Sequence, residues 1–279
     1  MSLYRKVYQL IKATREKQTI PIIVRKEPSE LLNNEVAFVA GGCGGIGISI
    51  VEHLLECGCK VIIGGTNKEK LCKCKEQLLT TNKQYQIETF IFKIDDFVNL
   101  KDNIKNIISI YGHIDIFINA SGVHTENLVL GNIPFDEFDR VININLKGPY
   151  YTAVEIAEYM KNNNIRGHIL FISSSRGSEP VWSPYGITKN AINSLVKGLA
   201  MQYIDFGITI NGIAPGPTAT KLIGINEGES IYSNETHLKR VAMPDEIAAF
   251  ATLLVSDNGN MLPGEMIHIS GGRGVFDIR

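Results

Sequence analysis

Seven short apolar runs, rich in β-branched residues, recur along the chain and alternate with amphipathic segments of helical periodicity. The apolar runs are 36–40, 60–65, 89–94, 115–121, 168–173, 209–214 and 266–270. Several are almost continuously apolar, which is typical of strands covered on both faces. The intervening helical segments are 48–58, 67–79, 97–112, 135–163, 185–205 and 244–257. This alternation predicts an α/β fold: a doubly wound, parallel seven-stranded sheet with helices on both faces.

The bulk composition is that of a protein that can bury a full core. Of 279 residues, 44% are hydrophobic, and the formal net charge is −1. This charge gives no argument for a nucleic-acid partner or an anionic membrane. No apolar run approaches the roughly 20 residues that span a bilayer, and the charged N-terminus lacks the apolar segment of a secretory signal. We expect a cytoplasmic protein with one domain over 35–279.

Residues 1–34 differ from the rest and are interpreted as an N-terminal arm. Leu3, Val7, Leu10 and Ile11 share one helical face, and the prolines that follow discourage a helix further on. The arm is expected to pack on its own domain or on a neighbouring subunit. The alternative is a basic amphipathic helix lying on a membrane, but large apolar anchors are scarce in it.

The five cysteines are Cys43, Cys57, Cys59, Cys72 and Cys74. An odd number in a long chain argues against a disulfide framework. The last four form two C-x-C pairs, whereas two to four residues usually separate paired zinc ligands. Residues two apart on a helix also point away from each other. We therefore expect no metal site.

A glycine-rich turn, "AGGCGGIG" over 40–47, lies between the first predicted strand and the helical segment that follows. A helix N-terminus offers unpaired N–H groups and the positive end of the helix dipole. Glycine lets the pyrophosphate of a dinucleotide approach the backbone. The expected contacts are Gly41, Gly42, Cys43, Gly44, Gly45, Ile46 and Gly47.

The chain resembles the short-chain dehydrogenase/reductase family over roughly residues 35–274. The resemblance is carried by motifs in a fixed order: "AGGCGGIG" (40–47), "INASG" (118–122), "NINLKG" (143–148), "ISSSRG" (172–177), "YGITK" (185–189), "APGPTAT" (214–220) and "IHISGG" (267–272). A lone Y-x-x-x-K is weak evidence, but the ordered set is specific. It implies a Rossmann fold and an NAD(P)-dependent oxidoreductase.

Tyr185 and Lys189 stand four residues apart, on one face of a predicted helix. A nearby ammonium favours the phenolate and so lowers the tyrosine pKa from its usual value of about 10. Tyr185 is therefore expected to exchange a proton with the substrate oxygen. The family resemblance implies that Lys189 also holds the nicotinamide ribose.

The resemblance assigns two further catalytic residues. Ser174 would donate a hydrogen bond to the substrate oxygen, although Ser173 or Ser175 is possible because the spacing to Tyr185 is short. Asn145 would hold a water in the proton relay, or would instead be a structural amide that bends its helix. The hydride itself moves on the nicotinamide.

The segment after the second strand bears on the choice of cofactor. NAD enzymes place an acidic residue there, but this chain has Gly65, followed by Thr66, Asn67 and Lys68. These three can donate to a 2′-phosphate, so NADP is preferred; NAD stays the alternative, with Glu69 replacing the missing acid. Further cofactor contacts implied by the resemblance are Ile94, Asp95, Asn119, Ala120, Ser121, Gly122, Tyr185, Lys189, Pro215, Gly216, Thr218 and Thr220.

Three positions depart from the family pattern. Lys93 stands where an Asp usually accepts from the adenine amino group, and lysine has no acceptor; Asp95, Asp96 or the backbone would have to replace it. Ala120 replaces an asparagine beside the cofactor, and Ser270 replaces a frequent Asp. None of the three belongs to the proton-transfer set.

We therefore expect hydride transfer between nicotinamide and a ketone or aldehyde, or a secondary alcohol. The alternative is a dinucleotide-binding scaffold or sensor with little turnover. Acyl thioesters, sugar-derived polyols and small ketones all stay candidate substrates. The expected substrate contacts are Ser174, Trp182 and His124, and the expected substrate loops are 123–135, 176–184 and 221–244. The last loop is a candidate lid. The helical segments 134–162 and 184–206 resemble those that pair subunits in the family, which suggests a homotetramer or else a dimer.

Overall fold

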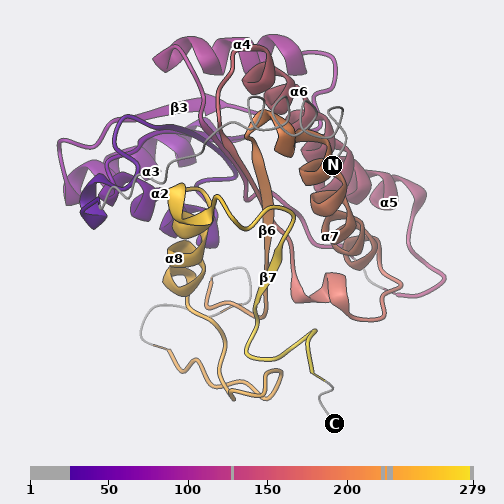
Figure 1. Cartoon of the computed structure of the whole chain (residues 1–279). Coiled ribbons are helices and arrows are strands. Elements are labelled where there is room, and N and C mark those ends of the chain that lie inside the picture. Colours follow the sequence, from indigo (N-terminus) through magenta and orange to yellow (C-terminus); the bar gives the residue numbers. More distant parts are fainter. Residues whose placement is uncertain (1–25, 127–128, 221–223, 225–228, 277–279) are drawn as a thin grey trace, which may run out of the picture.

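The computed structural model describes residues 26–126, 129–220, 224 and 229–276, and it forms one α/β domain (Figure 1). Seven parallel strands form one sheet in the order β3-β2-β1-β4-β5-β6-β7. The strands are β1 (Val36–Ala40), β2 (Lys60–Gly65), β3 (Ile87–Ile91), β4 (Ile116–Asn119), β5 (His168–Ile172), β6 (Thr209–Pro215) and β7 (Met266–Ile269). The prediction of a doubly wound, seven-stranded parallel sheet is confirmed.

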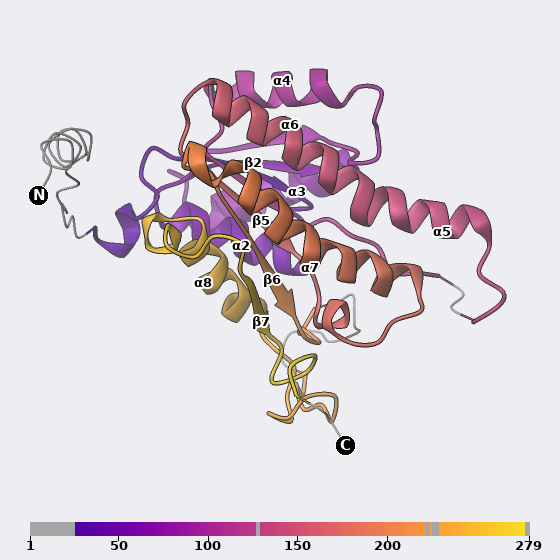
Figure 2. The same cartoon turned by 45° about the vertical axis from the view of Figure 1, so that its right-hand side comes forward.

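Helices cover both faces of the sheet (Figure 2). Around one buried cluster lie α2 (Gly45–Glu56), α3 (Lys68–Thr81) and α8 (Pro244–Leu254). Around the other lie α4 (Leu100–Tyr111), α6 (Gly148–Asn162) and α7 (Pro184–Tyr203), and α5 (Phe135–Ile142) leads into α6. The middle strands are fully buried because both faces are covered, which explains their unbroken apolar runs.

The order of the strands reverses direction at β1, which lies between β2 and β4. The connections from β1 and β4 therefore leave towards opposite sides, and a crevice opens at the carboxyl ends of the two strands. The glycine-rich turn follows β1, and the segment that begins with Ala120 follows β4. The fold thus brings the two motifs to one edge of the sheet.

The long helix expected over 135–163 is interrupted. Five residues, Asn143–Lys147, form a π-helical turn between α5 and α6. Gly148 permits this join, since a Cβ there would overlap the carbonyl of Ile94. The predicted strand 89–94 is also displaced: β3 ends at Ile91, and a turn closed by Asp96 N–H to Lys93 O begins soon after.

Part of the predicted N-terminal arm contributes to the domain. Pro28–Glu30 form a 3-10 turn, and Leu32 is buried in the core cluster of α2 and α8. The predicted arm helix falls in 1–25, outside the described residues. Among the residues that are described, no helix has both the length and the apolar character needed to cross a membrane.

Glu35, which precedes β1, should make the stability of the domain depend on pH. Burial, followed by the negative charge of Asp115, raises its pKa from 4.5 to about 7. The folded state therefore binds this proton more tightly than the unfolded state, and its contribution is lost as the pH rises through about 7. We expect Glu35→Gln to reduce the fall in unfolding free energy between about pH 5 and 8.

Urea unfolding at several pH values measures this effect. Glu27→Gln, at an exposed carboxylate, is the matched control. An unaltered pH dependence in Glu35→Gln would contradict the prediction.

Candidate active site

The glycine-rich turn is packed so tightly that two of its positions exclude any side chain. Gly41 has φ +79°, and a Cβ there would lie 2.7 Å from the amide nitrogen of Ser121. A Cβ on Gly47 would overlap the carbonyl oxygen of Gly41 and lie 2.9 Å from the Cα of Gly42. The turn therefore lies directly against the segment after β4, with the N-terminus of α2 beside it. A pyrophosphate fits here, since it needs exposed N–H groups and close backbone.

Three serines follow β5, and they take different positions. Ser173 turns towards α7, where its Oγ donates to Oδ1 of Asn193 at 2.6 Å. Ser174 forms a side-chain hydrogen bond with Tyr185, and its Oγ accepts from the N–H of Arg176. Ser175 begins a 3-10 turn and is buried. Of the three, Ser174 lies where it can share a substrate oxygen with Tyr185.

Tyr185 and Lys189 lie in the first two turns of α7, as their spacing predicts. Lys189 is buried; its Nζ donates to the carbonyl of Ile172 at 3.0 Å and lies 5.7 Å from the centre of the Tyr185 ring. Burial lowers the pKa of Lys189 to about 8. The ammonium is therefore held between the end of β5 and the tyrosine.

The pKa of Tyr185 differs from the expectation that Lys189 lowers it. Burial raises this pKa, and the hydrogen bond from Ser174 and the charge of Arg176 offset only part of the increase. Removing a phenol from water disfavours its charged form. Tyr185 is thus a protonated phenol at neutral pH, in the form that donates a proton.

Asn145 lies in the π-helical turn and is buried. Its Oδ1 accepts from the N–H of Val123, and its Nδ2 donates to the carbonyl of the same residue, both at 2.8 Å. A Cβ on Gly122 would lie 3.5 Å from the Asn145 Oδ1 and 3.6 Å from the Lys189 Nζ. Asn145 therefore anchors the segment after β4 and lies close to the Lys189 ammonium.

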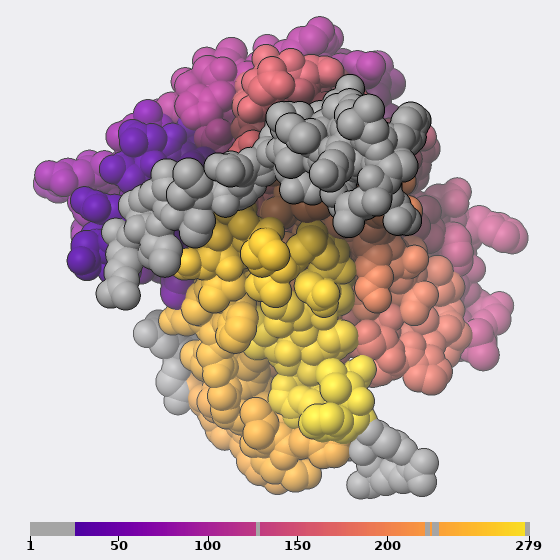
Figure 3. All heavy atoms as spheres, viewed as in Figure 1, coloured from indigo at the N-terminus to yellow at the C-terminus, as the bar shows by residue number. Residues whose placement is uncertain are grey.

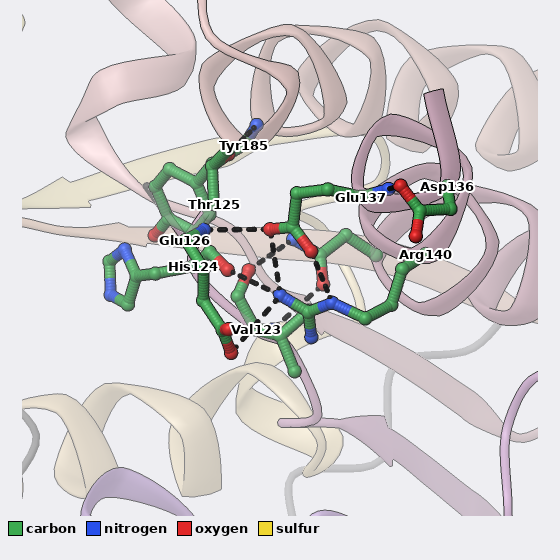
Figure 4. A network of polar contacts seen from close by, with 9 residues as sticks. Val123, His124, Thr125, Glu126, Asp136, Glu137, Arg140 and Tyr185 are labelled. Atoms are coloured by element: carbon green, nitrogen blue, oxygen red, sulfur yellow. Dashed lines mark hydrogen bonds and ion pairs between the residues drawn. The ribbon is translucent and has the colours of Figure 1, made fainter. Parts of the chain in front are cut away.

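The segment after β4 is fixed by a second group of polar contacts (Figure 4). Arg140 donates to the carbonyl of His124 at 3.0 Å and pairs with Glu137. Thr125 accepts a hydrogen bond from the N–H of Tyr185 at 3.1 Å. The His124 ring consequently stacks on Tyr185, with ring centres 4.4 Å apart. Burial, with the charge of Lys189, lowers the pKa of His124, so the imidazole is neutral at pH 7.

A cleft of about 680 Å³ opens above these groups. Ser174, Tyr185, His124 and Trp182 all line it, so the fold brings the predicted substrate residues together. The segments 215–218 and 232–235 form other parts of the wall. The carboxyl edge of the sheet thus carries one cleft with a phenol and a hydroxyl at its base and an ammonium behind them.

The model of the short chain dehydrogenase family matches residues 35–228. The chain belongs to the short chain dehydrogenase family. An uncharacterized oxidoreductase, YxbG of Bacillus subtilis strain 168, is 32% identical over 253 residues, which cover 86% of this chain and 91% of the relative. The 3-oxoacyl-[acyl-carrier-protein] reductase FabG of Rickettsia felis is 31% identical, with 86% and 97% covered. A short-chain dehydrogenase/reductase from Serratia marcescens has a TM-score of 0.79 at 25% identity, with 88% and 100% covered. The chain is therefore an oxidoreductase acting on CH–OH or C=O groups.

The other residues that the family resemblance implies for the cofactor lie along the same edge. Ser121 donates from its Oγ to Oδ1 of the buried Asn119 at 2.6 Å. Thr220 lies against Gly45, where a Cβ would overlap its side chain. Thr218 donates from Oγ1 to the carbonyl of Gly216, which follows Pro215 of β6. The segment after β6 therefore lies directly beside the glycine-rich turn.

The three departures from the family pattern have clear structural positions. Lys93 points to solvent and pairs with Asp95, with 3.8 Å between Nζ and Oδ2, while the adjacent Ile94 is buried. Ala120 donates its N–H to the carbonyl of Ala40, so the contact between β1 and β4 continues past the strand end. Ser270 is buried, and its carbonyl accepts from the N–H of Arg273. None of the three contacts Ser174, Tyr185 or Lys189.

Several residues of the short chain dehydrogenase site were not singled out by the sequence pattern. Thr125 and Arg140 fix the segment that carries His124. Arg176 and Arg273 line the cleft. Lys70 is close enough to the glycine-rich turn for its charge to lower the pKa of Cys43. Arg176 and Thr125 had a local signal, since Arg176 stands two residues after the predicted catalytic serine and Thr125 directly follows His124.

Proposed function

We propose that this protein is an NADP-preferring oxidoreductase that transfers a hydride between nicotinamide and a ketone, an aldehyde or a secondary alcohol. One observation carries the proposal: Ser174 and Tyr185 line one cleft at the strand ends where the glycine-rich turn also lies, and the buried Lys189 lies 5.7 Å from the centre of the Tyr185 ring. An exposed helix face would not place a buried lysine behind a tyrosine that hydrogen-bonds a serine.

Tyr185 is the proton donor in carbonyl reduction and the acceptor in alcohol oxidation. The bound cofactor supplies or accepts the hydride. Ser174 and Tyr185 both offer O–H groups to the carbonyl oxygen, where negative charge develops. The raised pKa of Tyr185 keeps the phenol protonated and ready to donate at neutral pH.

Lys189 and Asn145 support this proton transfer. With a pKa of about 8, Lys189 is largely charged at pH 7 but can give up a proton more readily than an exposed lysine. Its position behind Tyr185 lets the ammonium stabilise a phenolate as it forms. Asn145 bonds the backbone of Val123 through both atoms of its amide and so fixes the segment that lies near Lys189, while the relay water that the family resemblance implies stays a prediction.

The preference for NADP is supported by the surroundings of Gly65. This residue ends β2 without a carboxylate, and the exposed Thr66, Asn67 and Lys68 follow it. Asn67 uses its Oδ1 to cap α3, accepting from the N–H of Lys70 at 2.9 Å, so only its amide N–H groups remain to donate. Lys70 adds a second positive charge near the turn. The ammonium groups of Lys68 and Lys70 favour a 2′-phosphate, and the first carboxylate after Gly65 in the sequence is that of Glu69.

Initial rates of cofactor oxidation with carbonyl substrates test this function. We expect turnover with NADPH and a kcat/KM at least about tenfold lower with NADH, a difference of roughly 1.4 kcal/mol in transition-state binding. Absence of turnover across simple ketones, 3-oxo esters and keto sugars with both cofactors would contradict it. Tight cofactor binding without turnover would then favour the scaffold or sensor.

The cytoplasmic location and the assembly into a homotetramer or a dimer stay predictions.

A further inference from the structure

Two arginines, Arg176 and Arg273, lie in the wall of the active-site cleft, and Glu179 pairs with both of them. Among the described residues that line it, the charged side chains are Arg176, Arg273 and Glu235. His124 is neutral at pH 7 because burial lowers its pKa. The remaining lining is apolar, as at Val181 and Trp182, or carries hydroxyl groups. An arginine with unused N–H donors beside a reacting carbonyl favours a substrate that carries a negative group.

Arg273 is already committed to carboxylates of the protein. Its Nε donates to Oε1 of Glu179 at 2.8 Å, and its Nη1 pairs with Glu235. Its side chain is only 13% exposed. The pair with Glu235 joins the C-terminal segment to 229–243, and the two segments lie side by side on the molecular surface (Figure 3). Arg273 therefore holds the wall together.

Arg176 is placed differently. Its side chain is 53% exposed, and within the described residues its guanidinium makes one hydrogen bond, from Nη1 to Oε2 of Glu179 at 2.9 Å. A guanidinium has five N–H donors in a planar fork that matches a carboxylate. Glu179 keeps its bond from Arg273 if Arg176 turns into the cleft, so no buried charge loses its only partner.

Arg176 also lies near the reacting groups. It is the second residue of the turn that Ser175 begins, and its N–H donates to the Ser174 Oγ at 3.2 Å. Its charge is felt at Tyr185, where it lowers the pKa of the phenol. An anion bound by Arg176 would thus belong to the same small molecule as the carbonyl at Ser174 and Tyr185.

We propose that Arg176 binds a carboxylate on the substrate, so that the enzyme reduces oxo acids and oxidises the corresponding hydroxy acids. This inference rests on the proposed function, because it assigns the substrate class of that site. Arg176 is the specificity-determining residue, and the apolar lining at Val181 and Trp182 receives the carbon chain.

Paired probes test the proposal: 2-, 3- and 4-oxo acids and their uncharged methyl esters. Trp182, the only tryptophan, lines the cleft and reports binding by its fluorescence in the NADP complex, without any need for turnover. We expect at least one acid to bind about 10- to 100-fold more tightly than its ester. Arg176→Gln should remove this preference by weakening the binding of the acid, and Arg176→Lys should retain part of it.

The matched control is Arg166→Gln, which removes the same charge just before β5 begins, at the opposite edge of the sheet. It should keep the preference for acids. Esters binding as well as acids, neither probe binding, or an acid preference that survives Arg176→Gln would each overturn the inference. An acid preference in binding with no oxidation of NADPH would support the inference while contradicting the proposed function.

Discussion

Replacing Tyr185 with phenylalanine should lower kcat for carbonyl reduction by about 10²- to 10⁴-fold, the usual contribution of a positioned acid or base. The substitution removes one oxygen and leaves the ring stacked on His124. Binding of NADPH should be nearly unchanged, because the glycine-rich turn is untouched. Initial rates and a fluorescence titration of the same preparation measure both quantities.

The pH dependence gives a second readout of the same group. Since burial raises the pKa of Tyr185, the wild-type protein should reduce carbonyls across neutral pH and oxidise alcohols faster as the pH rises. Tyr111→Phe, on α4, is the control and should keep wild-type rates. If Tyr185→Phe retains full turnover, Tyr185 is not the proton donor.

The second large effect is expected from Gly47→Ala. The added methyl group would overlap the carbonyl of Gly41 and press on Gly42, both of them backbone that cannot yield without moving the turn. The N–H groups at the start of α2 would shift with it, so NADPH should bind at least about tenfold more weakly, a loss of roughly 1.4 kcal/mol. Isothermal titration calorimetry with NADPH measures this loss.

Gly198→Ala is the matched control for this substitution. Gly198 lies within α7, and no atom lies within 4 Å of the position a Cβ would take. The variant should bind NADPH as the wild type does and be slightly more stable, because alanine favours a helix. Equal NADPH affinity in Gly47→Ala and wild type would show that the turn does not hold the pyrophosphate.

The sheet could be predicted from the sequence because its central strands are covered on both faces. Burial on both sides requires apolar residues at every position, and this leaves a continuous run such as 36–40. The edge strand β3 was placed less well. Only Ile87 of its five residues is fully buried, and Phe92 continues the apolar character past its end.

The π-helical turn at Asn143–Lys147 could not be predicted from periodicity. A π-helical turn of only five residues changes the spacing of apolar positions very little. The sequence pattern of an interrupted helix is therefore nearly the same as that of a continuous one. The ordered motifs singled out Asn145 itself, but its two hydrogen bonds to Val123 depend on how α5 and α6 meet the segment after β4.

The pairing of Arg273 with Glu179 in the cleft wall could not be predicted from the sequence either. Arg273 and Glu179 are 94 residues apart, and only the positions of β5 and β7 relative to each other bring them into contact.

The lowered pKa expected for Tyr185 was wrong, because burial raises it. The spacing to Lys189 revealed the nearby charge, but it did not reveal how deeply the phenol is buried.

The measurement to make first is a fluorescence titration of the purified protein with NADPH and NADH, using energy transfer from Trp182, which lines the cleft, to the reduced nicotinamide. We expect saturable transfer with both cofactors and a Kd for NADPH at least about tenfold lower, or roughly 1.4 kcal/mol tighter. That result would place the nicotinamide beside Ser174 and Tyr185, and the 2′-phosphate near Lys68 and Lys70. If neither cofactor binds, the cleft is not a nicotinamide site, and the proposed chemistry of Tyr185 falls with it.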